Sequence, residues 1–69
     1  MKRNDQQKRS EEVRRLIIDT TMQIIKEEGF DSVSLRKISD RIRYSTGVIY
    51  YHFKDKQEII DTIHEQTNN

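Results

Sequence analysis

Two adjacent tyrosines and a histidine, Tyr50, Tyr51 and His52, lie just before two lysines, Lys54 and Lys56. Phenol hydroxyls and imidazole can donate hydrogen bonds to phosphate oxygens, or they can meet base edges and thymine methyl groups. Ammonium groups neutralise phosphates, and the backbone amides at the start of a helix beside Lys56 would complete a phosphate site. This group of residues predicts contact with a nucleic acid.

Two further basic residues, Arg36 and Lys37, come earlier in the chain, and Gly47 lies just before the tyrosines. A glycine in a short helix costs roughly 1 kcal/mol relative to alanine. Close approach of a DNA backbone or base edge would be a reason to keep it, and simple tolerance near a helix end is the alternative. Each lysine or arginine taken singly is an ordinary solvated charge. Their joint placement on both flanks of one short segment favours a polyanion as the partner.

Charge is unevenly distributed along the 69-residue chain, which carries 13 Lys and Arg against 12 Asp and Glu. Residues 1–15 and 34–56 are net positive, whereas residues 16–33 and 57–69 are net negative. This segregation fits one basic face turned toward a polyanion, with ordinary solvated faces as the alternative.

Several classes of protein are excluded or disfavoured by composition. The chain has no Cys, which excludes a disulfide scaffold and a thiolate metal site. It has two His, no Gly-rich phosphate loop and no His–Glu pair at metal spacing, so we expect neither an enzyme nor a cofactor nor a metal site. Asp61, His64 and Glu65 lie within about one helical turn, but a solvated face explains them better than a weak metal site.

No apolar run approaches the roughly 20 residues of a membrane span, and no apolar segment follows the basic N-terminus as in a secretory signal. We therefore expect a cytoplasmic protein without a membrane partner. The absence of Pro and the presence of two Gly are unfavourable for an all-β fold with tight turns.

The hydrophobic pattern predicts an all-α domain. Residues 1–9 are polar and are expected to form a flexible basic arm. Ser10 is expected to cap a first helix that Gly29 ends, after which Phe30 packs back onto the last turn. The apolar stripe of this helix comprises Val13, Leu16, Ile17, Thr20 and Ile24, and is widened by Ile18, Met22 and Ile25.

Two short helices and a longer one are expected to follow. Ser34 and Ser45 are suitable N-caps for the short helices, the second of which runs from about residue 46 to 52. Asp55 and Glu58 have the spacing of a capping box for the last helix. Buried positions in this half are Leu35, Ile38, Ile42, Ile49 and Phe53, together with one of the two adjacent tyrosines, because consecutive helical residues point about 100° apart.

This arrangement is that of a helix-turn-helix, whose second short helix enters the major groove of DNA. The expected architecture is all-α, with four helices in the order long, short, short and long. The remaining alternatives are a small protein-interaction module or antirepressor, and an amphipathic helix on a membrane surface. An interaction module would expose a large apolar patch around Ile18, Met22 and Ile60.

The chain resembles, over roughly residues 13–64, the N-terminal helix-turn-helix DNA-binding domain of TetR-family transcriptional regulators. The resemblance rests on motifs at fixed spacing: Ile24-Ile25, Glu28-Gly29-Phe30, Ser34 to Ile38, Ser45 to Phe53, Lys56, and Glu58-Ile59-Ile60. It implies an all-α, homeodomain-like fold, with a three-helix core that carries the helix-turn-helix and a fourth helix. It implies further that residues 10–69 are such a domain without the ligand-binding domain. It also implies a repressor that binds palindromic double-stranded DNA as a homodimer, held together by the missing C-terminal domain.

The resemblance and the residue chemistry together predict one set of DNA contacts: Ser34, Arg36, Lys37, Arg43, Ser45, Thr46, Gly47, Val48, Tyr50, Tyr51, His52, Lys54 and Lys56. The resemblance implies that residues 46–48 read bases, that Tyr50 and His52 contact phosphate or the groove, and that Lys56 clamps a phosphate. The N-terminal arm would add phosphate or minor-groove contacts through Lys2, Arg3, Lys8 and Arg9.

Three positions depart from the family pattern. Arg43 stands at the turn where glycine is usual, and a left-handed non-glycine residue there costs on the order of 1 kcal/mol. In return Arg43 is expected to face the DNA. Ser39 and Ile42 stand where small apolar residues are usual, and the larger Ile42 is expected to alter the approach of the two short helices.

Overall fold

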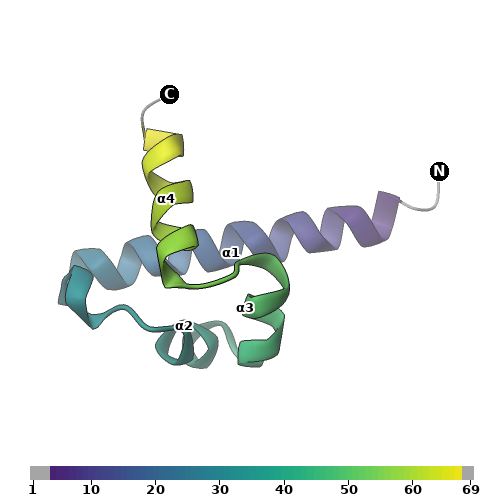
Figure 1. The fold of residues 1–69 in the computed structure, drawn as a ribbon. Helices are drawn as coiled ribbons and strands as arrows, with labels where there is room; N and C mark the ends of the chain where they lie inside the picture. Colours follow the sequence, from purple (N-terminus) through teal and green to yellow (C-terminus); the bar gives the residue numbers. More distant parts are fainter. Residues whose placement is uncertain (1–3, 68–69) are drawn as a thin grey trace.

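The computed structural model describes residues 4–67, and within this range it contains four α-helices, one 3-10 turn and no strand. Helix α1 (Asn4–Glu28) crosses the whole molecule, and η1 (Phe30–Ser32) leads from its end into α2 (Leu35–Ile42). Helices α3 (Thr46–His52) and α4 (Lys56–Thr67) follow, with α2 and α3 below α1 and α4 rising across it (Figure 1). The all-α prediction is confirmed, as are the bounds of the third helix.

Helix α1 begins six residues before the predicted cap at Ser10. Residues 4–9 therefore belong to the helix, and the predicted helix start at Ser10 is wrong. This segment contains Gln, Lys and Arg, which are good helix formers, and neither Gly nor Pro, so nothing in it stops the helix from extending.

All four helices contribute to one small hydrophobic core, in which isoleucine predominates. Its members are Ile17, Ile18, Ile24, Val33, Ile38, Ile49, Phe53, Ile59 and Ile63. Thr21 is also fully buried, and its hydroxyl donates to the carbonyl of Ile17 at 2.8 Å. Leu16, expected inside, is 40% exposed because it lies about 100° round the helix from Ile17, on the side away from Ile18.

The predicted C-terminal end of the first helix and the predicted N-cap of the second are confirmed. Gly29 ends α1 with a backbone φ of 99° and donates its N–H to the carbonyl of Ile25 at 2.9 Å. This region of backbone space is open essentially to glycine alone. Ser34 caps α2, since its hydroxyl accepts the backbone N–H of Lys37 at 3.1 Å.

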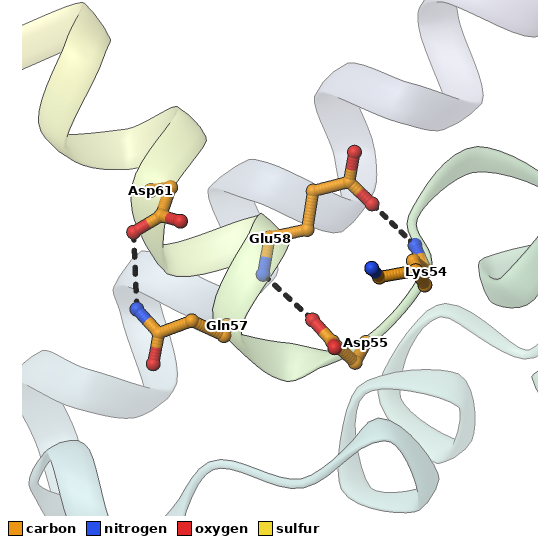
Figure 2. Close-up of a pocket in the computed structure, with 5 residues that line it drawn as sticks. All are labelled: Lys54, Asp55, Gln57, Glu58 and Asp61. Atoms are coloured by element: carbon orange, nitrogen blue, oxygen red, sulfur yellow. Dashed lines mark hydrogen bonds between the residues drawn. The ribbon is translucent and has the colours of Figure 1, made fainter.

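The two later helices start differently from each other. Ser45 holds the N-cap position of α3, but its hydroxyl makes no cap hydrogen bond. At the start of α4, Asp55 accepts the backbone N–H of Glu58 at 3.0 Å, while the Glu58 carboxylate accepts the backbone N–H of Lys54 (Figure 2). The predicted Asp55–Glu58 pair therefore forms, although Glu58 reaches one residue beyond the usual partner in a capping box.

The turn between α2 and α3 depends on a left-handed residue, Arg43, with φ 65° and ψ 31°. It is the one non-glycine residue with positive φ in the described part of the chain. Its N–H donates to the carbonyl of Ser39 at 2.8 Å, and the N–H of Tyr44 reaches the same carbonyl at 3.3 Å. Ser39 itself is buried, and its hydroxyl donates to the carbonyl of Arg36 at 2.9 Å.

Replacing Arg43 with glycine should raise the free energy of unfolding by about 1 kcal/mol, because glycine adopts the left-handed conformation without a steric cost. Urea denaturation followed by circular dichroism measures this change. The matched control is Asp40→Gly in the exposed part of α2, which should lower the free energy of unfolding by about 0.3 kcal/mol, because Asp is only slightly better than Gly in a helix. A lower stability for Arg43→Gly would mean that the turn is not strained.

Candidate nucleic-acid interface

Helix α3 is held against the rest of the molecule by two side chains. Ile49 is fully buried and Phe53, the residue at its C-terminal end, is 1% exposed. The N–H of Phe53 donates to the carbonyl of Ile49 at 2.8 Å, which closes the last turn. Both residues come from one side of the helix, so the opposite side is free of the core.

Both adjacent tyrosines lie on this free side. Tyr50 is 58% exposed and Tyr51 is 80% exposed, so the prediction that one of them is buried is wrong. The prediction failed because Ile49 and Phe53, four residues apart, already fill the inward arc of the helix. Tyr50 and Tyr51 fall on the remaining two thirds of the circumference. Two large aromatic side chains are thus presented to solvent by a helix of seven residues.

The first turn of α3 is accessible as well. Ser45, Thr46 and Gly47 are exposed, and Val48 is half-buried. A Cβ atom built on Gly47 would meet only the hydroxyl oxygen of Ser45, at the ordinary contact distance of 3.6 Å. Nothing within the described structure therefore requires glycine at position 47. This favours the interpretation that the glycine serves a partner approaching from outside.

His52 lies half-buried between α3 and α1. Its ring meets that of Tyr51 edge to face, with 5.1 Å between the ring centroids. Burial lowers the pKa of His52 from its ordinary 6.5, and the positive charge of Arg14 lowers it further. Arg14 stacks on Phe53, with the guanidinium carbon 5.2 Å from the ring centroid. His52 is therefore neutral at neutral pH, and it can offer hydrogen bonds but no positive charge.

A shallow hollow separates the N-terminal part of α1 from α3. Its lining joins two distant parts of the sequence: Arg9, Ser10 and Val13 from α1, and Tyr44, Val48, Tyr51 and His52 from the turn and α3. Arg9, predicted as part of an arm, thus lies on helix α1 and lines the same hollow as Tyr44 and Tyr51. Lys2 and Arg3 lie outside the described residues, as does the side chain of Lys8.

Tyr44 is a member of this surface that the sequence analysis did not select. It is 43% exposed and contributes to the wall of the hollow with Val48, which follows it by four residues. Its position directly before the N-cap Ser45 was the available signal, because a large aromatic residue in the turn must lie next to the first turn of the helix.

The cations of α2 and of the turn after it differ in whether they form ion pairs. Arg36 and Arg43 are exposed and make no ion pair within the described residues. The Lys37 ammonium, in contrast, is bound by the carboxylate of Glu28, and this interaction lowers the pKa of Glu28. Of the basic residues predicted to contact DNA here, Arg36 on α2 and Arg43 in the turn after it are the ones free to meet a phosphate.

The start of α4 offers less to an anion than the sequence suggested. The backbone amides of Lys54 and Glu58 are taken by the carboxylates of Glu58 and Asp55 (Figure 2). The hollow at this place is lined by three carboxylates and one ammonium, from Lys54, Asp55, Gln57, Glu58 and Asp61. Its charge is unsuited to phosphate.

The two lysines on this side differ in their surroundings. Lys54 is exposed, whereas the Lys56 ammonium lies 5.3 Å above the centre of the Phe30 ring. A cation–π contact of this kind fixes a lysine side chain without neutralising its charge. Phe30 itself is 47% exposed. Lys56 therefore remains available as a positioned cation.

The three residues predicted for the apolar patch of a protein-interaction module do not form a continuous exposed surface. Ile18 and Ile60 are buried at 1% and 4% exposure, and Met22 alone is 39% exposed. Among the described residues no group of three potential ligands is placed to hold a metal ion. No described helix has the length and apolar character needed to cross a membrane.

These features define a helix-turn-helix domain with an accessible second short helix. A family profile described as bacterial regulatory proteins, tetR family, matches residues 17–63, which is more than half of the chain. The chain belongs to this family. The family resemblance inferred from the sequence motifs is thereby confirmed.

Individual relatives agree with this assignment. The chain is 34% identical over 56 residues to the HTH-type transcriptional regulator AcrR of Shigella flexneri, covering 81% of this chain and 26% of the relative. It is 38% identical over 48 residues to the HTH-type transcriptional regulator BetI of Klebsiella pneumoniae strain 342, covering 70% of this chain and 25% of the relative. It is 29% identical over 49 residues to the class G tetracycline repressor protein of Vibrio anguillarum, covering 71% of this chain and 23% of the relative.

The chain thus spans about a quarter of the length of the relatives that it matches. No solved structure matches the chain at a significant level.

The lowered pKa of His52 predicts an acid-sensitive contribution to stability. Below its ordinary pKa of 6.5 the unfolded chain binds a proton that folded His52 resists, so falling pH favours unfolding. Replacing His52 with glutamine should flatten the decline in the free energy of unfolding between about pH 7 and about pH 5. Urea denaturation at several pH values across this range measures the free energy of unfolding of both proteins.

The exposed His64 provides the matched control, because His64→Gln removes the other histidine of the chain. This variant should retain the decline seen in the unsubstituted chain. The pKa of Glu28 is lowered from 4.5, so its contribution is lost only at more acidic pH than this range. If His64→Gln flattened the profile and His52→Gln did not, the burial of His52 would have no linked effect on stability.

Proposed function

We propose that this chain binds double-stranded DNA in a sequence-specific manner by inserting α3, residues 46–52, into the major groove. The observation that carries the proposal is the division of α3 into two faces. Ile49 and Phe53 anchor the helix in the core. The exposed residues of the helix take no part in the core: Thr46, Gly47, Tyr50 and Tyr51. A recognition helix requires such an anchored inner face and a free outer face.

Distinct roles follow from the position of each side chain. The accessible first turn, with Ser45, Thr46, Gly47 and Val48, is suited to contact base edges and thymine methyl groups. Tyr50, Tyr51 and neutral His52 supply hydrogen bonds to phosphate oxygens or to the groove without adding charge. Ser34, at the exposed start of α2, would donate its hydroxyl hydrogen to a phosphate while its oxygen accepts the N–H of Lys37.

Electrostatic contacts would come from the cations that flank α3. Within residues 9–66, Arg36 on α2, Arg43 in the turn, and Lys54 and Lys56 near the start of α4 make no ion pair. Arg9 of α1 adds a positive charge at the hollow that α1 and α3 line together. Contacts of this kind set affinity and its salt dependence, while the first turn of α3 would set the preferred sequence.

We further infer that the regulator acts as a homodimer on a palindromic operator, through residues beyond those of the helix-turn-helix domain. The chain covers only about a quarter of each relative, which leaves room in those proteins for a dimerising region. Because one of the relatives is a tetracycline repressor protein, we infer repression as the outcome of binding. Repression would take place on DNA in the cytoplasm.

The proposed function can be tested by fluorescence anisotropy with a pool of random duplex DNA over a salt series, followed by sequencing of the bound fraction. We expect affinity to fall steeply with salt, with a slope of log affinity against log salt of about −0.9 for each phosphate neutralised. We also expect one half-site motif to be enriched. Absence of binding even at low salt, or binding without any enriched motif, would contradict sequence-specific recognition.

The two glycines of the chain predict opposite outcomes when each is replaced with alanine. Gly47→Ala should raise the free energy of unfolding by up to about 1 kcal/mol, because alanine favours the helix and the added Cβ meets no clash. The same variant should lower affinity for the selected half-site by about tenfold, because the Cβ would stand between α3 and the DNA. Urea denaturation and anisotropy measure the two effects.

Gly29→Ala is the matched control. It places a Cβ at a backbone φ of 99° and should lower the free energy of unfolding by about 1–3 kcal/mol. Among folded molecules its affinity for DNA should be unchanged, because Gly29 lies at the end of α1 away from α3 (Figure 1). Unchanged affinity for Gly47→Ala would exclude close approach of DNA at that position.

A further inference from the structure

A compact cluster of four charges joins the end of α1 to α2, on a side of the molecule that the proposed recognition contacts leave unused. Its members are Glu27 and Glu28 in the last turn of α1, and Lys37 and Arg41 on α2. Lys37 binds the first carboxylate oxygen of Glu28, and Arg41 binds the second at 2.9 Å. Arg41 also reaches Glu27 at 3.0 Å.

The geometry of the cluster is that of one carboxylate serving two cations. Lys37 and Arg41 are four residues apart and so lie on the same face of α2. Both cations are bound by glutamates in the last turn of α1, so this face of α2 is turned toward the end of α1. Arg36 on α2 and Arg43 in the turn after it are exposed and make no ion pair among the described residues.

Stability is a poor explanation for this cluster. The four side chains are between 33% and 47% exposed, and ion pairs at such positions contribute little to folding. Two glutamates in the last turn of α1 also stand at the negative end of the helix dipole, where acidic residues are unfavourable. The placement of these acids therefore calls for a reason other than helix stability.

The cations themselves suggest that reason. Without the glutamates, α2 and the turn after it would present Arg36, Lys37, Arg41 and Arg43 against the single acidic residue Asp40. Four neighbouring cations would attract any DNA backbone, because phosphate attraction carries no sequence information. A regulator gains specificity when its sequence-independent affinity is low.

We propose that Glu28 determines specificity by withholding Lys37 and Arg41 from DNA phosphates. The inference rests on the proposed DNA binding. The carboxylate keeps both cations at the end of α1. Arg36 on α2 and Arg43 in the turn after it are then the cations of this region that contact DNA phosphates. Lys37 is then an indirect participant and does not contact DNA, in contrast to the prediction from the sequence.

The test compares Glu28→Gln with the unsubstituted chain on random duplex DNA, by anisotropy at several salt concentrations. The variant frees one or two cations, so the slope of log affinity against log salt should become steeper by about 1 to 2. At that slope, a fourfold reduction in salt raises affinity by about 3.5-fold more for each freed cation. The preference for the selected half-site over random DNA should fall.

Asp31→Asn is the matched control for net charge. Asp31 lies in the neighbouring η1 and makes no ion pair among the described residues, so this variant removes one negative charge without freeing a cation. Its salt slope should stay unchanged. The double variant Glu28→Gln, Lys37→Gln should return the slope toward that of the unsubstituted chain, and Lys37→Gln alone should leave it unchanged. Circular dichroism of each variant verifies that it is folded under the conditions of the titration.

The outcomes separate this inference from the proposed function. If the unsubstituted chain binds DNA with an enriched motif but Glu28→Gln leaves the slope and preference unchanged, the withholding role of Glu28 is overturned and the proposed function stands. A slope that falls by about one in Lys37→Gln alone would also overturn it, because Lys37 would then contact phosphate directly. If the unsubstituted chain binds no duplex DNA, both proposals fail.

Discussion

The seven residues of α3 are too few to form a stable helix in water, so the exposed surface of this helix depends on the burial of Ile49 and Phe53. These two side chains occupy the core together with Ile38 of α2 and the isoleucines of α1 and α4. Their burial fixes the rotation of α3, and that rotation decides which side chains face outward. The accessibility of Gly47, Tyr50 and Tyr51 is thus a consequence of core packing.

A second constraint is electrostatic. The chain has nearly equal numbers of basic and acidic residues, so any net attraction to a polyanion must come from their arrangement. The folded structure sorts the cations by partner: Lys37 and Arg41 are bound by glutamates, Arg14 and Lys56 stack on phenylalanine rings, and Arg36 and Arg43 are free of ion pairs within the described residues. Carboxylate partners neutralise a cation, whereas aromatic partners fix its position and leave its charge.

Local signals in the sequence were sufficient for most of the secondary structure. The cap at Ser34, the glycine that ends α1, the Asp55–Glu58 pair and the bounds of α3 depend on neighbouring residues, so they could be predicted. The start of α1 could not, because good helix formers carry the helix past the first suitable cap. Likewise the left-handed Arg43 followed from the family pattern, while its hydrogen bond to Ser39 required the folded chain.

By itself the sequence determined an all-α helix-turn-helix domain of the tetR family, because hydrophobic periodicity and motif spacing are properties of the linear chain. Only the tertiary structure decided that both Tyr50 and Tyr51 are exposed, that Lys37 is paired with Glu28, and that Arg9 and Tyr44 line the same hollow as Val48. The physical reason is the same in each case. These outcomes depend on which side chains from distant segments meet, and packing around a shared core sets those meetings.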